Sequence, residues 1–294
     1  MSDAIINIDV AAWVERAKND PVAYRQRQAA EILLNAIAMI TPFNDKLYLK
    51  GGTLMGLAYG SPRQTTDIDF TADLAVCADI DETIRSLLDR TFPRAAAVLG
   101  YDDFVVKVNS IKRRPRQSNF ETARFPALAL KVGYAIRGSR QESALREGRC
   151  PHPIHVDISF NEPTHTIQIL RLTDGKTLRA YSLIDLIAEK YRAMLQQVPR
   201  NRSRRQDVYD IYLLIEHEQI NDDNRRRILD AFLEKSRSRD LEPDRDALDN
   251  PEIKHRCSKE WDTLQLELGD VPNFETCFTR VRGFYRALPW AVTP

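Results

Sequence analysis

Two carboxylates stand two positions apart in the chain, at Asp67 and Asp69. The surrounding residues 66–71 have the apolar and β-branched composition of a short strand. Because side chains of a strand alternate between its faces, both carboxylates are predicted to point to one side, and Ile68 and Phe70 to the other, toward a core. Like charges on one face repel unless a cation lies between them, and hard divalent cations prefer carboxylate oxygens. The pair therefore predicts a divalent metal site.

A glycine turn precedes this strand. Gly51, Gly52 and Thr53 follow a predicted strand at residues 46–50 and are expected to open a short helix. The exposed backbone N–H groups of such a turn at a helix N-terminus bind anions. Metal-binding carboxylates beside a phosphate cradle indicate chemistry on a nucleoside triphosphate.

A third carboxylate is carried by residues 154–160, which alternate cleanly between apolar and polar positions. His155, Asp157 and Ser159 share the polar face. If this strand pairs beside the Asp67/Asp69 strand, Asp157 completes a carboxylate triad. The third carboxylate would then help to hold a second metal, about 3.5–4 Å from the first, that activates an attacking hydroxyl. From the alternation alone, Asp157 can equally be a solvent-exposed strand residue.

Charged residues of the later, helical part form a second candidate group. A lysine such as Lys190 on a helix can neutralise triphosphate oxygens as a compact point charge. Asp207 and Asp210 are three residues apart and share a helix face, and Arg204 precedes Asp207 by the same spacing. The alternative is an ordinary surface face of ion pairs.

Composition limits the class of protein. The chain has 294 residues, 43% of them hydrophobic, and a net charge of +1, so it predicts one large or two globular domains without a global bias toward nucleic acid or acidic membranes. The cysteines are too far apart to predict a zinc site or a disulfide framework: Cys77, Cys150, Cys257 and Cys277. No apolar run is long enough to span a membrane and no signal peptide is recognisable, so a cytoplasmic location is expected.

The order of the predicted elements indicates an α+β fold. Besides the strands above, the pattern predicts a helix at 22–40 and another at 79–88, and a polar loop at 137–150. Further strands are predicted at 104–111, 126–136 and 166–172. After about residue 180 the pattern is helical, with helices at 182–190, 203–215, 224–235, 260–268 and 274–287. We therefore predict a mixed sheet with flanking helices in residues 1–175 and a C-terminal helical domain in residues 176–294.

Together these motifs resemble a known family. Lys50-Gly51-Gly52-Thr53, Tyr59-Gly60, Arg63, Thr66 and Asp67-Ile68-Asp69 resemble the first motif of the AbiEii/AbiGii-type nucleotidyltransferase toxins, in the DNA polymerase β-like nucleotidyltransferase superfamily. The superfamily pattern ends with a distant third aspartate on a strand, which Asp157 fits. Two later segments also resemble the toxin family, Glu189–Arg192 and Arg205–Asp210, although Gln206 stands where a basic residue often precedes the aspartate. The resemblance covers about residues 46–215.

The resemblance implies a nucleotidyltransferase-type fold and transfer of a nucleoside monophosphate from an NTP, with release of pyrophosphate. It implies that Asp67 and Asp69 bind Mg²⁺, with Mn²⁺ as an alternative, and that Asp157 joins the metal site and assists the nucleophile. The remaining roles implied are catalysis by Lys190 and Asp207, and nucleotide binding by Gly51, Gly52, Thr53, Arg63 and Lys190. It also implies a toxin–antitoxin system: an antitoxin encoded nearby, and an RNA acceptor such as the tRNA 3′ end, whose modification blocks translation.

An RNA acceptor requires phosphate-binding charge near the site. Arginine and lysine cluster at residues 112–116, 200–205 and 225–227, and we expect the first two clusters to flank an acceptor groove. Two alternatives stay open from the sequence: transfer to a protein or small molecule, and a non-catalytic nucleotide-binding protein that keeps the fold.

Overall fold

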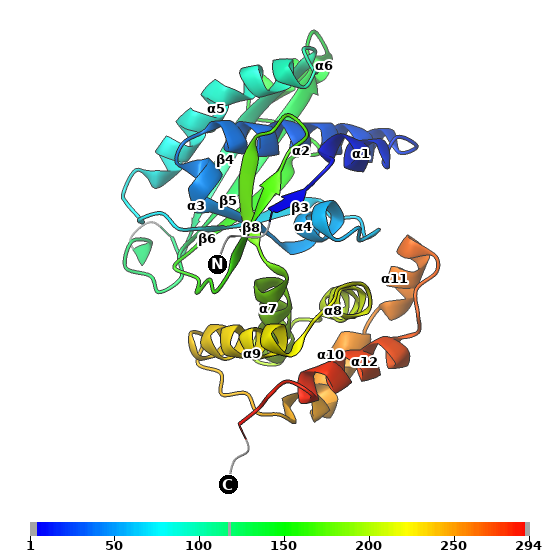
Figure 1. Ribbon diagram of the computed structural model, residues 1–294. Coiled ribbons are helices and arrows are strands. Elements are labelled where there is room, and N and C mark those ends of the chain that lie inside the picture. The colour runs from blue at the N-terminus through cyan, green and yellow to red at the C-terminus, as the bar shows by residue number, and fades with distance from the viewer. Residues whose placement is uncertain (1–4, 117–118, 292–294) are drawn as a thin grey trace. The chain divides into compact units, whose positions relative to one another are not determined.

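The computed structural model describes residues 5–116 and 119–291 and divides the chain into two compact units (Figure 1). The first unit contains the chain up to Gly60, Thr65–Glu162 and Gln168–Ala180. The second contains Ser61–Gln64, Pro163–Ile167 and the chain from Tyr181 onward. Each unit therefore includes segments that are distant in sequence.

The first unit is built on one sheet, in which the described strands have the order β1-β7-β8-β2-β3-β6-β5-β4. The strands are β1 (Ile5–Asn7), β2 (Leu47–Lys50), β3 (Asp67–Ala72), β4 (Phe104–Arg114), β5 (Ala127–Ile136), β6 (Ile154–Phe160), β7 (Ile167–Arg171) and β8 (Thr177–Tyr181). β3 lies in the interior of the sheet, antiparallel to β2 and parallel to β6. The strand with the paired aspartates is thus held on both sides by backbone hydrogen bonds.

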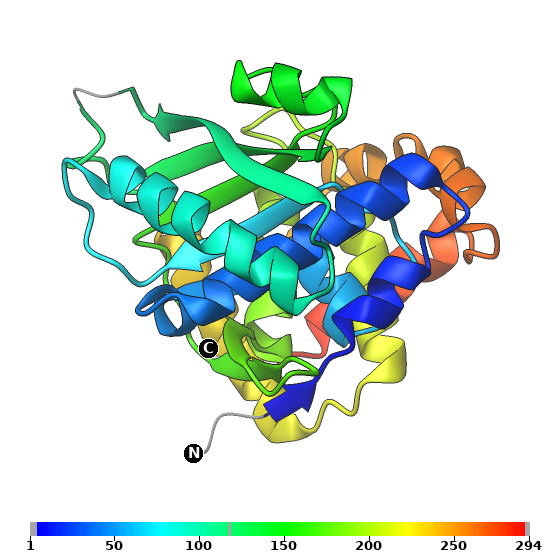
Figure 2. The same cartoon turned by 90° about the horizontal axis from the view of Figure 1, so that it is seen from above.

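Helices α2 (Pro21–Met39) and α5 (Ile80–Val98) lie side by side and cover one face of the sheet (Figures 1 and 2). Asp20 caps α2 by accepting hydrogen bonds from the N–H groups of Val22 and Ala23, and Pro21 occupies the first helical position, where its missing N–H costs nothing. α5 extends well beyond the predicted residues 79–88 and contains Pro93. Its buried apolar face runs from Phe92, directly before the proline, to Ala95 and Ala96 beyond it, so packing offsets the hydrogen bond that the proline cannot form.

Shorter helices complete the first unit: α1 (Val10–Glu15), α3 (Phe43–Lys46), α4 (Gly51–Ala58) and α6 (Arg140–Arg146). The prediction of a loop at 137–150 is wrong where α6 forms. The sequence of α6 is mostly polar, but its Leu145 side chain is buried and holds the helix in place. Glu142 also accepts a hydrogen bond from the Gly138 N–H.

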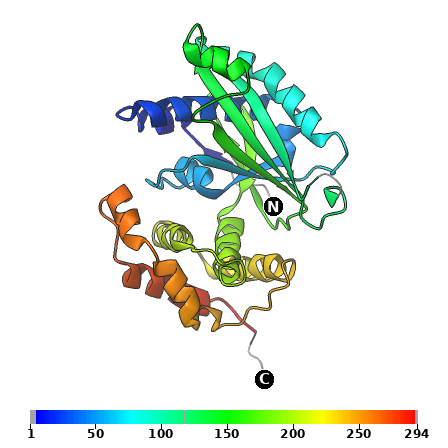
Figure 3. The ribbon, with the colours of Figure 1, turned by 180° about the vertical axis from the view of Figure 1, so that it is seen from behind.

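The second unit is helical (Figure 3). It contains α7 (Leu183–Gln196), α8 (Arg205–His217), α9 (Asp222–Arg237), a 3₁₀ turn at Ala247–Asp249, α10 (Pro251–Ser258), α11 (Trp261–Leu268) and α12 (Phe274–Arg286). Tyr191, Phe232 and Tyr285 are buried and their rings contact one another, which joins α7, α9 and α12 in one core.

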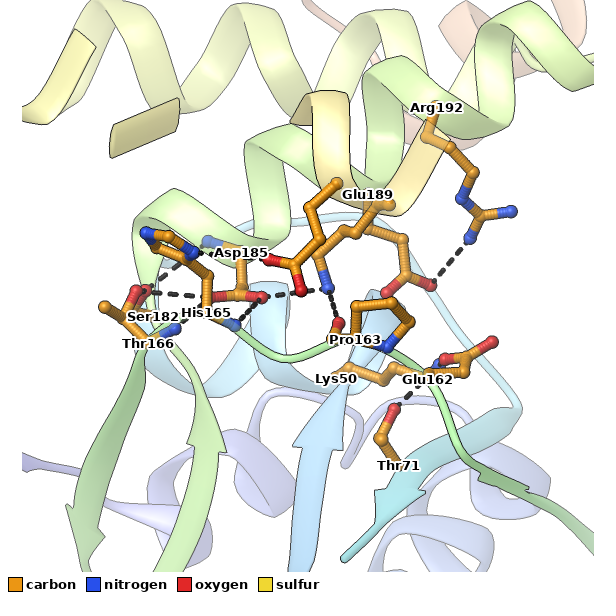
Figure 4. Close-up of polar contacts among 12 residues, drawn as sticks. Lys50, Thr71, Glu162, Pro163, His165, Thr166, Ser182, Asp185, Glu189 and Arg192 are labelled. Atoms are coloured by element: carbon orange, nitrogen blue, oxygen red, sulfur yellow. Dashed lines mark hydrogen bonds and ion pairs between the residues drawn. The ribbon is translucent and has the colours of Figure 1, made fainter. Parts of the chain in front are cut away.

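A buried ion pair fixes the short segment 163–167 to the helices of this unit (Figure 4). The Lys235 ammonium contacts Asp185 at 2.9 Å and donates to the Pro163 carbonyl at 2.6 Å. Asp185 also accepts from the backbone N–H groups of His165 and Thr166. Burial lowers the pKa of Lys235, but nearby Tyr181 and Asp185 outweigh it, so the pKa is raised and the ammonium stays charged.

The fold class predicted from the sequence, a mixed sheet with helices followed by helical structure, is confirmed. The principal change of unit falls between Ala180 and Tyr181. Among the described residues, none of the helices has both the length and the apolar character that a membrane crossing requires.

Candidate active site

The three predicted carboxylates share one face of two neighbouring strands. In the parallel pair β3–β6, Asp69 lies directly beside Asp157, and Asp67 lies beside His155. Their neighbours Ile68, Val156 and Ile158 point to the opposite face, where they are buried. The expected pairing of the two strands is therefore present, and it brings the carboxylates together on the accessible side of the sheet.

The carboxylate face is open. Asp67 is exposed, and the Asp157 carboxylate forms an ion pair with the Arg114 guanidinium, 3.6 Å away. The Asp157 side chain is about half exposed, at 47%, and that of Arg114 is exposed at 65%. Such solvent-screened pairs contribute little to stability and separate easily. Asp157 is accordingly accessible to a cation or a hydroxyl group.

Gly51 allows the Asp69 carboxylate to lie against the N-terminus of α4. Its φ of +71° belongs to the left-handed region that favours glycine. A Cβ at this position would overlap the Oδ2 atom of Asp69. Two requirements, the backbone conformation and the close approach, thus select glycine at the first position of the predicted phosphate-binding turn.

Thr53 positions β3. Its hydroxyl is buried and donates to the backbone carbonyl of Asp67 at 3.0 Å, and the Thr65 hydroxyl donates to the same carbonyl at 3.3 Å. Both contacts fix the start of the strand that carries the two aspartates. The contact of the Thr53 hydroxyl with a triphosphate stays a prediction.

A buried lysine stands at the junction of β2 and the glycine turn. Lys50 is the antiparallel neighbour of Asp69, and its ammonium forms an ion pair with Glu162 (Figure 4). Glu162 also accepts a hydrogen bond from the Thr71 hydroxyl at 3.2 Å. This cluster ties β2, β3 and the end of β6 together immediately beside the aspartates.

The donor set suits a metal that arrives with a nucleotide. Among the described residues, no three His, Cys, Asp or Glu side chains are gathered closely enough to hold a metal ion by themselves. Mg²⁺ is usually bound by one or two carboxylates together with water and substrate phosphates, and rarely by a closed protein cage. The oxygen-only pair Asp67 and Asp69 fits that kind of site.

A cleft of about 550 Å³ opens on the same face. It is lined by Thr66, Asp67, Ser110, Lys112, Arg114, Ala129, Leu130, Lys131, His155 and Asp157. Two of the carboxylates therefore border the cleft, together with three cationic side chains from β4 and β5. Lys131 was not singled out in the sequence, although its spacing from Ala129 and Ala127 places it on the accessible face.

The other predicted site residues form a network in the second unit. Lys190 donates to Asp210 at 2.6 Å and to Asp207 at 3.2 Å. Arg63 contacts both oxygens of Asp210, at 3.3 and 3.2 Å, and Arg204 lies 3.5 Å from Asp207. Lys190 and Asp210 are buried, so this is not a surface face of ion pairs.

Mutual attraction keeps these buried groups charged. Burial raises the pKa of Asp210, but Lys190 and Arg63 outweigh that effect, and its pKa is below the usual value. Burial lowers the pKa of Lys190, but Asp210 and Asp207 outweigh it, and the pKa is raised. Each group is thus stabilised in its ionised form by its partners.

The basic cluster at residues 112–116 divides between two faces of β4. Lys112 and Arg114 line the cleft. Arg113 instead forms an ion pair with Asp81 and lies over the Phe120 ring, with the guanidinium carbon 5.2 Å from the ring centroid. Arg113 therefore joins β4 to α5 and does not flank the cleft. In the second cluster, Arg204 and Arg205 pair with Asp207 and Glu260.

Comparison with known proteins identifies the family of the chain. The family model described as "Nucleotidyl transferase AbiEii toxin, Type IV TA system" matches residues 32–280. The chain belongs to this family. It is a nucleotidyltransferase of the toxin type, and the family implies a nucleotide substrate and a cognate antitoxin.

Solved structures share the fold. The chain is similar to MenT4, a nucleotidyltransferase toxin of Mycobacterium tuberculosis H37Rv, with a TM-score of 0.55 and 16% identity, over 94% of this chain and 88% of that one. It is also similar to JHP933 of Helicobacter pylori, with a TM-score of 0.50 and 14% identity, over 93% of this chain and 92% of that one. Comparison with the curated proteins gives no match.

Proposed function

We propose that this nucleotidyltransferase uses Mg²⁺, with Mn²⁺ as a substitute, to transfer a nucleoside monophosphate from an NTP to an RNA, with the tRNA 3′ end as the acceptor. Modification of that end would prevent aminoacylation and so inhibit translation. The observation that carries the proposal is the register of β3 and β6, in which Asp69 lies beside Asp157 on the face that also presents Asp67.

The proposed roles follow from these positions. Asp67 and Asp69 would hold the metal that accompanies the triphosphate, and the backbone of Gly51 and Gly52 at the α4 N-terminus would bind its phosphate oxygens. A divalent metal held there would neutralise developing charge on the phosphates and increase the acidity of the attacking hydroxyl. Asp157, which is accessible to solvent and lies beside Asp69, would take up the proton of that hydroxyl.

In the reaction, the acceptor hydroxyl oxygen forms a bond to the α-phosphorus while the bond from that phosphorus to the bridging oxygen breaks. Pyrophosphate leaves with the electron pair, and the hydroxyl proton passes to Asp157. Positioning and electrostatic stabilisation supply most of the catalysis in phosphoryl transfer. The ordered contacts of Thr53, Gly51 and Lys50 around the aspartates support this requirement.

Arg63, Lys190 and Asp207 are proposed to contribute on the strength of the family resemblance. Arg63, Lys190 and Arg204 carry three positive charges against the two carboxylates of Asp207 and Asp210, so these five side chains keep a net positive charge. A net positive group favours an anionic ligand such as a triphosphate.

The test is incubation of the protein with Mg²⁺, total cellular RNA and each NTP radiolabelled at the α-phosphate. We expect label in an RNA band with the wild type. Asp69→Asn should reduce the rate by about a thousandfold or more, since a metal ligand contributes several kcal/mol to the transition state. The matched control is Asp102→Asn, an exposed aspartate of the same unit that lies outside the cleft.

Equal labelling by Asp69→Asn and wild type would overturn the proposed metal site. Label in protein or in a small molecule, with none in RNA, would overturn the proposed acceptor. Loss of labelling on chelation of Mg²⁺, and its recovery with Mn²⁺, is the expected result for the cofactor.

A further inference from the structure

Two rows of side chains cross the accessible face of four neighbouring strands. Strand pairing places Lys112, Ala129, Asp157 and Asp69 side by side in one row. It places Ser110, Lys131, His155 and Asp67 in the next row. In both rows the carboxylate stands at the β3–β6 end and a lysine stands toward β4 and β5.

Small side chains form the middle of this surface. Ala127 and Ala129 precede Lys131 on the accessible face of β5, while Leu128 and Leu130 are buried. The alanines leave room between the long basic side chains of β4 and the Asp157 carboxylate of β6. The cleft of about 550 Å³ occupies this region, with Lys112, Arg114 and Lys131 among its lining residues.

The order of the strands separates the glycine turn, the carboxylates and the basic side chains across the sheet. Across the sheet, the strands run β2, β3, β6, β5, β4. The glycine turn follows β2, the carboxylates are on β3 and β6, and the basic side chains are on β5 and β4. The carboxylates therefore separate the turn proposed to bind the triphosphate from the basic cleft.

Phosphoryl transfer requires the attacking and the leaving oxygens to be roughly in line on opposite sides of the phosphorus. If pyrophosphate leaves on the β2 side, the acceptor hydroxyl must arrive from the β5 and β4 side. We propose that Lys112, Lys131 and Arg114 bind the backbone phosphates of a single-stranded RNA acceptor and direct its 3′ hydroxyl to Asp157. This inference rests on the proposed function, because it assigns the acceptor half of that same site.

The chemistry of the lining favours an RNA backbone. Three of the lining residues are cationic, and the His155 imidazole is the single aromatic ring among them, so the cleft offers mainly charge for phosphates and little surface for stacking bases. Recognition there is accordingly tolerant of sequence. The Arg114–Asp157 contact, at 3.6 Å and exposed, can exchange for an acceptor phosphate without disturbing the core.

The test uses the full chain with the double substitution Lys112→Glu/Lys131→Glu. The matched control is Lys107→Glu, which reverses an exposed lysine of the same strand β4 outside the cleft. Binding of a short fluorescein-labelled single-stranded RNA is measured by anisotropy over a series of salt concentrations. Binding of a non-hydrolysable NTP analogue with Mg²⁺ is measured by calorimetry on the same variants.

We expect the double variant to bind the RNA roughly tenfold more weakly, and its plot of log affinity against log salt to be shallower by about 0.7 for each lost contact. Its affinity for the NTP analogue should equal that of the wild type, as should its melting temperature. Lys107→Glu should match the wild type in all three measurements.

Three results would overturn the inference. The first is unchanged RNA affinity in the double variant, and the second is an equal loss in Lys107→Glu. The third is weaker binding of the NTP analogue, which would assign the lysines to the triphosphate. Failure of the proposed function gives a different result: the wild type transfers no label from any NTP to RNA. The comparison of RNA binding between the variants still decides in that case whether the cleft binds RNA.

Discussion

Aspartates of this protein occur in two opposite settings. On the sheet face, Asp157 is half exposed and its ion-pair partner Arg114 lies 3.6 Å away. In the helical unit, Asp210 is fully buried. Its carboxylate accepts hydrogen bonds from the Lys190 ammonium and from the Nε and Nη2 atoms of Arg63. The carboxylate in the first unit is therefore accessible to a ligand, whereas the one in the second unit is buried and already paired with two cationic side chains.

The difference follows from desolvation. A carboxylate that must bind a cation or accept a proton has to remain accessible, and exposed ion pairs give up little stability when they open. A carboxylate removed from water must be compensated by close cations, and loss of one partner leaves an uncompensated buried charge. We therefore expect substitutions on the sheet face to affect the reaction, and substitution of the buried Asp210 in the helical network to affect folding.

The largest expected effect on stability is that of Asp210→Asn. It leaves Lys190 and Arg63 buried without their shared carboxylate, which should lower the free energy of unfolding by about 3–5 kcal/mol. Urea denaturation followed by circular dichroism measures this value. Asp230→Asn, at an exposed position of α9, should change it by less than about 0.5 kcal/mol. Similar values for both variants would show that the network is not a source of stability.

Acid should remove the same contribution from the wild type. The folded-state pKa of Asp210 is depressed below the ordinary value of 3.8, so its ionised form stabilises the fold at any pH above 3.8. The stabilisation is lost as the pH falls from 3.8 through the folded-state pKa. The difference in unfolding free energy between wild type and Asp210→Asn should thus be constant between about pH 5 and 8 and shrink below pH 3.8. A difference that persists undiminished far below that pH would contradict this account.

The two settings also explain how much the sequence could predict. The alternation of residues 66–71 and 154–160 was sufficient to place Asp67, Asp69 and Asp157 on accessible faces, because a strand has one dominant side-chain period. Their adjacency, however, depends on the order of the sheet, which brings β6 next to β3 across a long stretch of chain. Local pattern contains no information on that pairing.

The helical network was only partly predictable. Spacing predicted that Asp207 and Asp210 share a helix face, and a face of ion pairs was one interpretation. Burial of that face depends on Arg63, which lies far away in sequence, in the short segment Ser61–Gln64 that belongs to the helical unit. The wrong prediction of a loop at 137–150 has a similar cause, namely a tertiary contact that the local sequence does not reveal. The burial of Leu145 stabilises α6, and its own polar sequence does not.

A smaller effect, confined to the sheet face, is expected from Gly51→Ala. Gly51 and Gly60 have similar positive φ angles of +71° and +65°, so alanine introduces comparable backbone strain at both, about 1–2 kcal/mol. Only at Gly51 would the new Cβ meet the Asp69 carboxylate, whereas nothing lies within 4 Å at Gly60. Gly51→Ala should therefore reduce kcat/KM for nucleotidyl transfer severalfold or more beyond Gly60→Ala. Equal activity of the two variants would show that the position of Asp69 is not critical.

The smallest expected effect distinguishes two roles of Thr53. Thr53→Val removes the hydrogen bond to the Asp67 carbonyl and should cost about 1 kcal/mol of stability, because Thr65 still donates to that carbonyl. If Thr53 only positions β3, kcat falls while KM for the NTP is unchanged, and Thr53→Ser restores the wild-type rate. If its hydroxyl binds the triphosphate, KM for the NTP rises in Thr53→Val. Steady-state kinetics on the two variants thus shows whether this buried hydroxyl belongs to the scaffold of the carboxylate face or to its ligand.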